Sequence, residues 1–177
     1  MHRDPSAVTL RLFQPGDQDQ VEWLQKRTPA AGQVAWREAT VPDDLRRIPE
    51  IYAAYWVAVE ALQNQSGTTD VIVGMTGMTR VAALGVGPPV PDFLDTPPGS
   101  ARLHRMRGAP ERWRRGIGRE LARAALDWAR DERFESVILD TTPRQEAAVS
   151  LYRSLGFVEK GRSALGPYEL MWFQLVL

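Results

Sequence analysis

The sequence contains no cysteine among its 177 residues and only two histidines, His2 and His104. Without cysteine, disulfide scaffolds, cysteine nucleophiles and cysteine-ligated metal sites are excluded, and two histidines are too few for a histidine-built site, so we expect no metal. No apolar run reaches the roughly 18 residues that a membrane-spanning helix needs. The polar start, Met1 to Pro5, also lacks the apolar segment of a secretion signal. These absences predict a cytoplasmic protein that does not enter a membrane.

The charge is balanced in total but not in position. The 22 basic and 22 acidic side chains give a net charge of zero, and 44% hydrophobic with 25% charged residues is typical of one soluble globular domain. Seven arginines nevertheless lie between Arg102 and Arg119, where Glu111 is the only acid. Such a run is typical either of a solvated face or of a site for a small anion. Nucleic acid usually requires a broader basic excess, so we expect no nucleic-acid partner.

Hydrophobic periodicity predicts alternating strands and helices. Strands are expected at 8–13, 55–60, 70–79, 102–107, 137–139, 157–158 and 168–177. Helices are expected after Asp17, over 43–55, from Gly116, and from Thr142 to a stop at Gly156. The order of these elements after residue 101 predicts a mixed sheet flanked by helices.

Individual residues predict caps, kinks, bulges and loops within or between these elements. Asp17 is placed to cap the first helix, and Pro49 predicts a kink or a later start for the helix over 43–55. Gly74 and Gly77 within a strand predict bulges or a close backbone approach. Half of the residues from Gly85 to Ser100 are glycine or proline, which favours a long surface loop over a linker between domains.

The start of the helix after Gly116 carries the clearest chemical signal. The segment Arg114-Arg115-Gly116-Ile117-Gly118-Arg119 follows a predicted strand and opens a strongly amphipathic helix. Unpaired N–H groups and the helix dipole favour an anion there, glycines let a phosphate approach the backbone, and arginines add charge. The known nucleotide loops do not fit, since there is no Gly-Lys-Ser/Thr and no third glycine at the dinucleotide spacing. We therefore expect a pyrophosphate on another carrier.

Two segments resemble the GNAT N-acetyltransferase superfamily. Residues 110–121 (PERWRRGIGREL) are similar to its acyl-CoA loop, and residues 145–157 (QEAAVSLYRSLGF) to its signature ending in Leu-Tyr-x-x-x-Gly-Phe. The resemblance covers about 102–160. It implies the acyl-CoA N-acyltransferase fold, an α/β (α+β) architecture with a mixed, mostly antiparallel sheet of six to seven strands and helices on both faces. The sequence departs from the family pattern at Trp113, where glutamine or arginine is usual, at Gly108 and at Gln145.

The resemblance also implies a binding site for acetyl-CoA. Backbone amides of residues 114–119 would hold the pyrophosphate, and the strand 106–108 would pair with the pantetheine arm where two strands splay apart. An N–H near residue 106 or 107 would polarise the acetyl carbonyl. The acetyl-CoA-binding residues expected in this way are Met106, Arg107, Gly108, Arg114, Arg115, Gly116, Ile117, Gly118, Arg119 and Gln145.

Two side chains are the candidates for proton transfer. On the resemblance, Tyr152 would be the acid that protonates the leaving thiolate; a tyrosine beside Leu151 on an amphipathic helix could equally be a core residue. His104 is named as the base because its ordinary pKa suits that work, with a packing role as the alternative. Strand alternation would put His104 and Met106 on one face and Arg105 and Arg107 on the other. Glu60, Glu111 or a chain of waters are the other base candidates.

The expected function is acetyl transfer from acetyl-CoA to an amine of a small molecule or peptide, by one domain over residues 1–177. The alternatives are a non-catalytic acyl-CoA-binding or regulatory protein of the same fold, and a nucleic-acid-binding domain. Residues 28–56 and 85–100 are expected to shape the acceptor side. Aromatic residues of these ranges would line a pocket for an apolar or cationic group, or else lie in the core: Trp36, Tyr52, Tyr55, Trp56 and Phe93. Acids near the pocket would attract an amine, or else face solvent: Asp43, Asp44, Glu50 and Glu60. The C-terminal strand is an exposed edge or a dimer contact, and we favour a homodimer.

Overall fold

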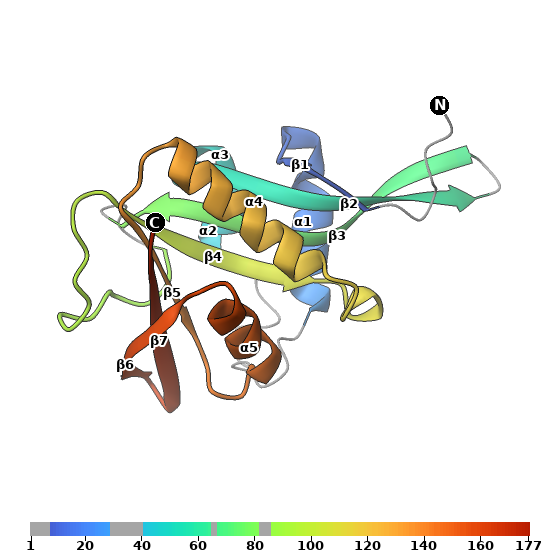
Figure 1. Ribbon diagram of the computed structural model, residues 1–177. Helices are drawn as coiled ribbons and strands as arrows, with labels where there is room; N and C mark the ends of the chain where they lie inside the picture. Colours follow the sequence, from blue (N-terminus) through green and yellow to red (C-terminus); the bar gives the residue numbers. More distant parts are fainter. Residues whose placement is uncertain (1–7, 29–40, 65–66, 82–85) are drawn as a thin grey trace.

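The computed structural model describes residues 8–28, 41–64, 67–81 and 86–177 (Figure 1). Within them, seven strands form one sheet: β1 (Val8–Leu12), β2 (Ala54–Asn64), β3 (Gly67–Arg80), β4 (Ser100–Gly108), β5 (Ser136–Thr141), β6 (Val158–Leu165) and β7 (Tyr168–Val176). The helices are α1 (Gln18–Arg27), α2 (Asp43–Arg46), α3 (Ile48–Ile51), α4 (Ile117–Asp131) and α5 (Glu146–Ser154), with 3-10 turns η1 (Pro15–Asp17) and η3 (Pro110–Arg112). No helix in these ranges combines the length and apolar character needed to cross a bilayer.

The sheet is mixed and mostly antiparallel, as predicted. Its strand order is β1-β2-β3-β4-β5-β7-β6, and β4 with β5 is the parallel pair. Figure 1 shows α4 lying across one face of β2, β3 and β4, with α1 on the other face. The sheet is therefore covered on both sides, and its strands can bury apolar residues in both directions.

The helix α4 is built as its sequence pattern predicts. Ile117, Leu121 and Ala125 recur at helical spacing and are buried against the sheet. Trp128 continues the same stripe and meets Trp56 of β2 edge to face, with ring centroids 5.8 Å apart. This packing fixes the N-terminus of α4 relative to the strands beneath it.

Glycine lets α4 approach β3 closely. A Cβ atom placed on Gly74 would lie 2.8 Å from Cγ2 of Ile117 and 3.0 Å from Cδ1 of Leu121. The β2–β3 and β3–β4 pairings also shift register near Gly74 and Gly77. Both consequences predicted from these glycines, bulges and close approach, are confirmed.

Replacing Gly74 by valine is expected to lower the free energy of unfolding by about 1–3 kcal/mol. The added methyl groups would overlap Ile117 and Leu121 and force α4 away from the sheet. Urea denaturation measures the change. Gly16→Ala is the matched control, because a Cβ at Gly16 meets nothing within 4 Å. Equal stabilities of the two variants would contradict the close packing.

The prediction of one helix over 43–55 is wrong, because the helical part is broken and ends at Ile51. Two single turns, α2 and α3, occupy its first part, and Tyr52 is already extended. Pro49 explains the break, because proline has no N–H to donate to the Leu45 carbonyl, four residues earlier, and its ring would clash with that carbonyl in a regular helix. The Leu45 carbonyl instead accepts a hydrogen bond of 2.8 Å from the Gln18 side chain. The chain can thus turn early into β2.

Asp17 occupies the N-cap position of α1, but its side chain does not cap that helix. The carboxylate instead accepts hydrogen bonds from the Gln14 N–H at 2.8 Å and from both terminal nitrogens of Arg11 at 2.6 and 2.8 Å. The prediction that Asp17 caps α1 is therefore wrong, because its carboxylate binds Arg11 and the Gln14 N–H and not an N–H group of α1. The carboxylate ties β1 to η1 because a guanidinium competes well for it.

The C-terminal region differs from the prediction in two ways. The strand expected at 157–158 is the eight-residue β6. Its residues are mostly polar or charged, so a search for apolar runs predicts too short a strand. The strand β7 pairs with both β5 and β6, so it is internal, and the sheet edges are β1 and β6. An exposed C-terminal edge is therefore wrong, and the homodimer stays a prediction.

The glycine- and proline-rich segment is irregular throughout its described part, 86–99, as predicted. It is nevertheless packed on the sheet. Leu94 lies in an apolar cluster with Ile138 and Trp172, and the Arg102 guanidinium donates to the carbonyls of Val86 and Pro88 at 3.4 and 2.7 Å. These contacts hold the loop beside β5 and β7.

Candidate active site

The turn before α4 presents a row of unpaired backbone donors. Within the described residues, the N–H groups of residues 114–118 donate to no protein acceptor. Gly116 is the N-cap residue, with a left-handed φ of 83°, and Arg114 has a φ of 64°. The 15-residue α4 adds the positive end of its dipole at this point. The arrangement can bind an anion without moving.

Strands β4 and β5 separate next to this turn. They pair only at Ser100–Arg102 against Ser136–Ile138. Beyond Arg102, β4 keeps β3 on one side and pairs with no strand of the described residues on the other, and Figure 1 shows β4 and β5 diverging. The predicted splay is confirmed. The predicted binding residues Met106, Arg107 and Gly108 lie on the open part of β4, where backbone groups can pair with a ligand.

A bulge in β4 changes which side chains share a face. Arg105 has a left-handed φ of 54°, and the β3–β4 register shifts at this point. His104 contacts the Tyr52 ring, and Arg105 reaches Asp44, whose carboxylate also binds Tyr52. The prediction that His104 and Arg105 lie on opposite faces is therefore wrong, because the extra residue interrupts the alternation.

A buried cluster holds this bulge from the α2 side. Asp44 accepts two hydrogen bonds from Arg105, at 2.9 and 2.6 Å, and one from the Tyr52 hydroxyl. Burial, and then the Asp44 carboxylate, raise the pKa of Tyr52 well above its ordinary value, so the phenol stays a donor. Sequence reasoning treated Asp44 and Tyr52 only as acceptor-side candidates. Nothing local in the sequence links them to Arg105.

Tyr152 of α5 is buried among aromatic rings but keeps a free hydroxyl. Its ring contacts Phe157 and Phe173 at 5.8 and 6.5 Å between centroids. The hydroxyl makes no hydrogen bond with the described part of the chain. Burial raises the pKa of Tyr152, while the charge of Arg107 on β4 opposes that shift. The residue therefore combines a core position with the protonated hydroxyl that an acid needs.

His104 is buried on β4, where Nε2 lies 2.8 Å from Thr79 Oγ1. Burial, and then the charges of Arg102 and Arg105, lower the pKa of His104 well below its ordinary value. The imidazole is therefore neutral at physiological pH. A neutral imidazole can accept a proton, so the base role stays a prediction, with the Thr79 hydrogen bond fixing the ring.

Lowering the pH from 7.5 to 5 is expected to destabilise the fold through His104. The unfolded chain takes up a proton below the ordinary pKa of about 6.5, whereas the folded chain does not, so stability falls as the pH drops through 6.5. This contribution is bounded at about 2 kcal/mol at pH 5. Urea denaturation at both pH values measures it. His104→Gln cannot titrate and should lose this part of the pH dependence; an unchanged dependence would contradict the buried neutral histidine.

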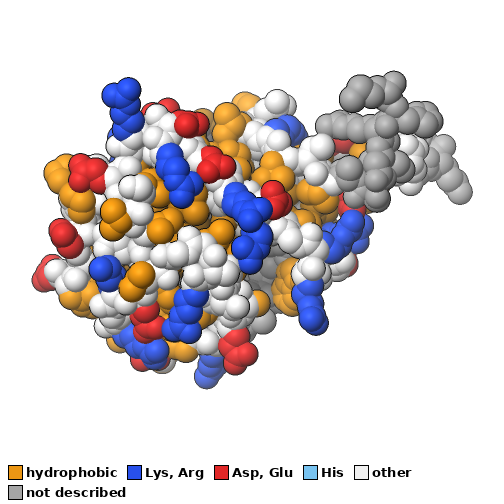
Figure 2. All heavy atoms as spheres, in the orientation of Figure 1, with side chains coloured by type: hydrophobic (Ala, Val, Ile, Leu, Met, Phe, Trp, Pro, Cys, Tyr) orange, Lys and Arg blue, Asp and Glu red, His pale blue; other side chains and the backbone are white. Residues whose placement is uncertain are grey.

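The arginine run is largely neutralised in three dimensions. Four of its seven members form ion pairs with acids from other segments: Arg102 with Asp140, Arg105 with Asp44, and Arg112 and Arg115 with Glu60. On the face that carries α4, Figure 2 shows basic side chains scattered among acidic and apolar ones. The sequence excess of six charges therefore does not form one continuous basic surface, because distant carboxylates fold against it. Arg114 has no ion-pair partner among the described residues.

The departures from the family pattern have structural roles of their own. The Trp113 indole N–H donates to the Gly108 carbonyl at 2.7 Å, so its side chain ties the turn to the end of β4. The Gln145 side-chain oxygen accepts from Thr141 Oγ1 at 2.6 Å and from the Thr142 N–H at 3.2 Å. Neither contact uses an N–H group of residues 114–118.

Two other predicted site residues have partners. Arg119 donates to Ser154 Oγ at 2.9 Å, which joins α4 to α5. Glu111, an alternative base, forms an ion pair of 2.7 Å with Arg27. Glu60, the other carboxylate candidate, forms ion pairs with Arg112 and Arg115, at 2.7 and 3.1 Å.

The aromatic side chains expected on the acceptor side divide between core and surface. Tyr52, Tyr55 and Trp56 are buried, which favours the core interpretation for them. Phe93 is exposed and its ring lies over Gly161 of β6. Trp36 lies outside the described residues.

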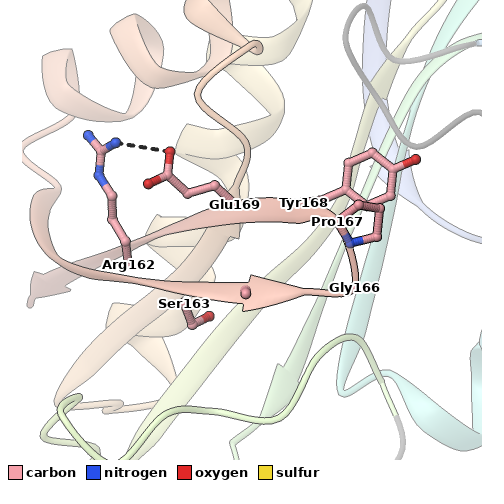
Figure 3. Close-up of a pocket in the computed structure, with 7 residues that line it drawn as sticks. Arg162, Ser163, Gly166, Pro167, Tyr168 and Glu169 are labelled. Carbon is pink, nitrogen blue, oxygen red and sulfur yellow. Dashed lines mark hydrogen bonds and ion pairs between the residues drawn. The ribbon is translucent and has the colours of Figure 1, made fainter.

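A shallow hollow of about 540 Å³ lies on the β6–β7 hairpin. Figure 3 shows Arg162 and Glu169, an ion pair of 3.1 Å, along the hairpin, and Pro167 and Tyr168 at its turn. None of the predicted site residues lines this hollow. It therefore adds nothing to the candidate active site.

Comparison with curated proteins finds relatives that acetylate. Human N-acetyltransferase 8 is 41% identical over 66 residues, which is 37% of this chain and 27% of that protein. Mycothiol acetyltransferase of Renibacterium salmoninarum is 28% identical over 164 residues, 93% of this chain and 44% of that protein. The chain spans less than half the length of these two relatives.

Solved structures share the fold. A GCN5-related N-acetyltransferase from Kribbella flavida superposes with a TM-score of 0.69 at 21% identity, covering 98% of this chain and 100% of that one. A GNAT acetyltransferase from Brucella melitensis, solved with acetyl-CoA, gives a TM-score of 0.63 at 17% identity and covers 97% and 88%. The family model described as "Acetyltransferase (GNAT) family" matches residues 18–157, from the start of α1 to three residues beyond α5. With the turn before α4 and the splayed strands inside that match, the chain belongs to the acetyltransferase (GNAT) family.

Proposed function

We propose that this chain is an acetyl-CoA-dependent N-acetyltransferase that moves an acetyl group from CoA to an amine of a small molecule or peptide by direct attack. The observation that carries the proposal is the row of unpaired N–H groups at residues 114–118, which follows the open part of β4. The family relationship and the acetyl-CoA complex of the Brucella relative support it.

The residues present fit the phosphate end of this donor. A Cβ placed on Gly116 would meet nothing within 4 Å, and one on Gly118 would meet only Leu151, at 3.6 Å. The turn is thus open on the side where these glycines lie, and its donors lack acceptors. In the proposal, the amides of residues 114–118 hold the pyrophosphate; the Arg119 N–H, expected to join them, already donates to the Gly116 carbonyl at 2.9 Å. Arg114, which lacks an ion-pair partner in the described chain, adds positive charge.

Acetyl-CoA supplies the activated acetyl thioester. In the proposal the backbone of 106–108 pairs with the pantetheine arm and Gln145 donates its side-chain N–H to it. An N–H at residue 106 or 107 polarises the acetyl carbonyl. Tyr152 delivers a proton to the departing sulfur, and His104 takes one from the amine. Residues 28–56 and 85–100 shape the acceptor side.

Thiol release from acetyl-CoA over a panel of small and peptide amines tests the proposal. One or more amines should release CoA at a rate above hydrolysis, with the acetylated amine detected by mass spectrometry. A thermal-shift comparison accompanies it, in which CoA should raise the Tm and an oligonucleotide should not. A Tm raised by CoA with no acetylated amine would leave a non-catalytic acyl-CoA-binding protein. A Tm unmoved by CoA would overturn the proposal.

A further inference from the structure

A single carboxylate lies beneath the turn that precedes α4. Glu60 belongs to β2, some 50 residues away in sequence, and its side chain is only 4% exposed. Its Oε2 accepts from Arg112 Nε at 2.7 Å, and its Oε1 accepts from Arg115 Nη1 at 3.1 Å. Both oxygens are therefore used, and both partners come from the same turn.

The two arginines bracket the part of the turn that needs to be held. Arg112 ends η3, and Arg115 directly precedes Gly116, the N-cap residue. Between them lies Arg114 in a left-handed conformation, which is unfavourable for a residue with a Cβ. A short segment with such a residue needs contacts from outside to keep one conformation.

Apart from the two hydrogen bonds that the Gly116 carbonyl accepts from α4, the other contacts named here hold the beginning of the turn. The Ala109 N–H donates to the Val73 carbonyl at 2.8 Å, and the Trp113 indole to the Gly108 carbonyl at 2.7 Å. Neither reaches residues 114–116, where the unpaired N–H groups begin. The Glu60–Arg115 pair is the described contact that holds this end of the turn from another strand.

We propose that Glu60 is a positioning residue that fixes the anion-binding turn through Arg112 and Arg115, so that the N–H groups of 114–118 are aligned before CoA binds. This inference rests on the proposed function, because it takes the CoA pyrophosphate as the anion. Glu60 itself does not touch the ligand. It acts by removing the conformational freedom that the turn would otherwise lose on binding.

The alternative is that Glu60 competes with CoA for Arg115, in which case Glu60 would weaken CoA binding and not strengthen it. The Arg115 side chain is 43% exposed and holds Glu60 by one hydrogen bond, so Glu60 could compete with phosphate for it. If competition dominated, removing the carboxylate would free positive charge and tighten CoA binding. If positioning dominates, removing it loosens CoA binding.

Glu60→Gln is tested by isothermal titration with CoA and with pantetheine, which lacks the phosphates. Positioning predicts a Kd for CoA raised about tenfold or more with the Kd for pantetheine unchanged. Arg112→Lys keeps the charge but loses the Nε hydrogen bond and should show the same selective loss. Asp17→Asn is the matched control, since it breaks the buried Asp17–Arg11 pair between β1 and η1 and should leave both Kd values unchanged.

The outcomes separate this inference from the proposed function. Wild-type protein that binds no CoA would overturn both. Wild-type protein that binds CoA, with a Glu60→Gln variant that binds it equally or more tightly, would overturn the positioning role alone. Equal losses for CoA and pantetheine would do the same, because they would indicate general damage to the fold. Should Glu60→Gln fail to fold, Arg112→Lys decides the question by the same two ligands.

Discussion

Tyr152→Phe is expected to lower kcat roughly 10- to 1000-fold, the usual range for loss of a general acid. The proposed reaction leaves a thiolate, and a positioned phenol is the group that would protonate it. Arg107 of β4 lies close enough to affect the pKa of Tyr152, so the hydroxyl is near the strand proposed to hold the donor. Steady-state kinetics with saturating acetyl-CoA and a responsive amine give the number.

The fold is expected to tolerate this substitution. The Tyr152 hydroxyl makes no hydrogen bond within the described residues, so phenylalanine leaves no partner unsatisfied and keeps the ring contacts with Phe157 and Phe173. Tyr55→Phe is the matched control, because it removes a buried hydroxyl that has no partner in the described chain, from the core of β2. A kcat that is unchanged in Tyr152→Phe, or lowered equally in both variants, would remove Tyr152 from the mechanism.

The raised pKa of Tyr152 also predicts how kcat responds to alkaline pH. An acid must carry its proton, and burial keeps the proton on Tyr152 at pH values where a free phenol, with a pKa of about 10, begins to ionise. Tyr152 should therefore cause no loss of kcat between pH 8 and pH 10. An alkaline decrease in that range that disappears in Tyr152→Phe would show an unshifted phenol instead.

Local patterns were enough to predict the segments around the proposed donor site. The apolar stripe from Ile117 to Trp128, the glycine at 116 and the stop at Gly156 are all readable within one or two helical turns. Each depends on contacts that recur at a fixed sequence spacing, such as three or four residues in a helix. The structure confirms these elements for that reason.

Contacts across the sheet could not be predicted in this way. Asp44 binds Arg105 over a separation of 61 residues, and Glu60 binds Arg112 over 52. No periodic pattern links such residues, so the sequence predicts a solvated face or an anion site for the arginine run and does not show that its acidic partners come from α2, β2 and β5. The bulge at Arg105 is not predictable for a related reason, since alternation along a strand assumes an unbroken register.

Gly118→Asp is expected to weaken CoA binding without lowering the stability of the fold. A carboxylate in the first turn of α4 favours the helix dipole by about 0.3–1 kcal/mol, and replacing glycine in a helix adds a similar gain. The only atom near an added Cβ is Leu151 Cδ2, at an ordinary 3.6 Å. Urea denaturation should therefore show a free energy of unfolding equal to or above that of the wild-type protein.

CoA binding should nevertheless fall about 100-fold or more in this variant. The new carboxylate would accept the N–H groups that the phosphates need, and like charges 4 Å apart near a protein surface repel by about 4 kcal/mol before salt screening. Gly118→Ala is the control, because it fills the same Cβ position without charge and should keep most of the affinity. Titration calorimetry with CoA gives both values. A Gly118→Asp variant that binds CoA as tightly as Gly118→Ala would mean that the phosphates lie elsewhere, since a negative charge at residue 118 cannot be neutral toward a pyrophosphate held by the neighbouring N–H groups.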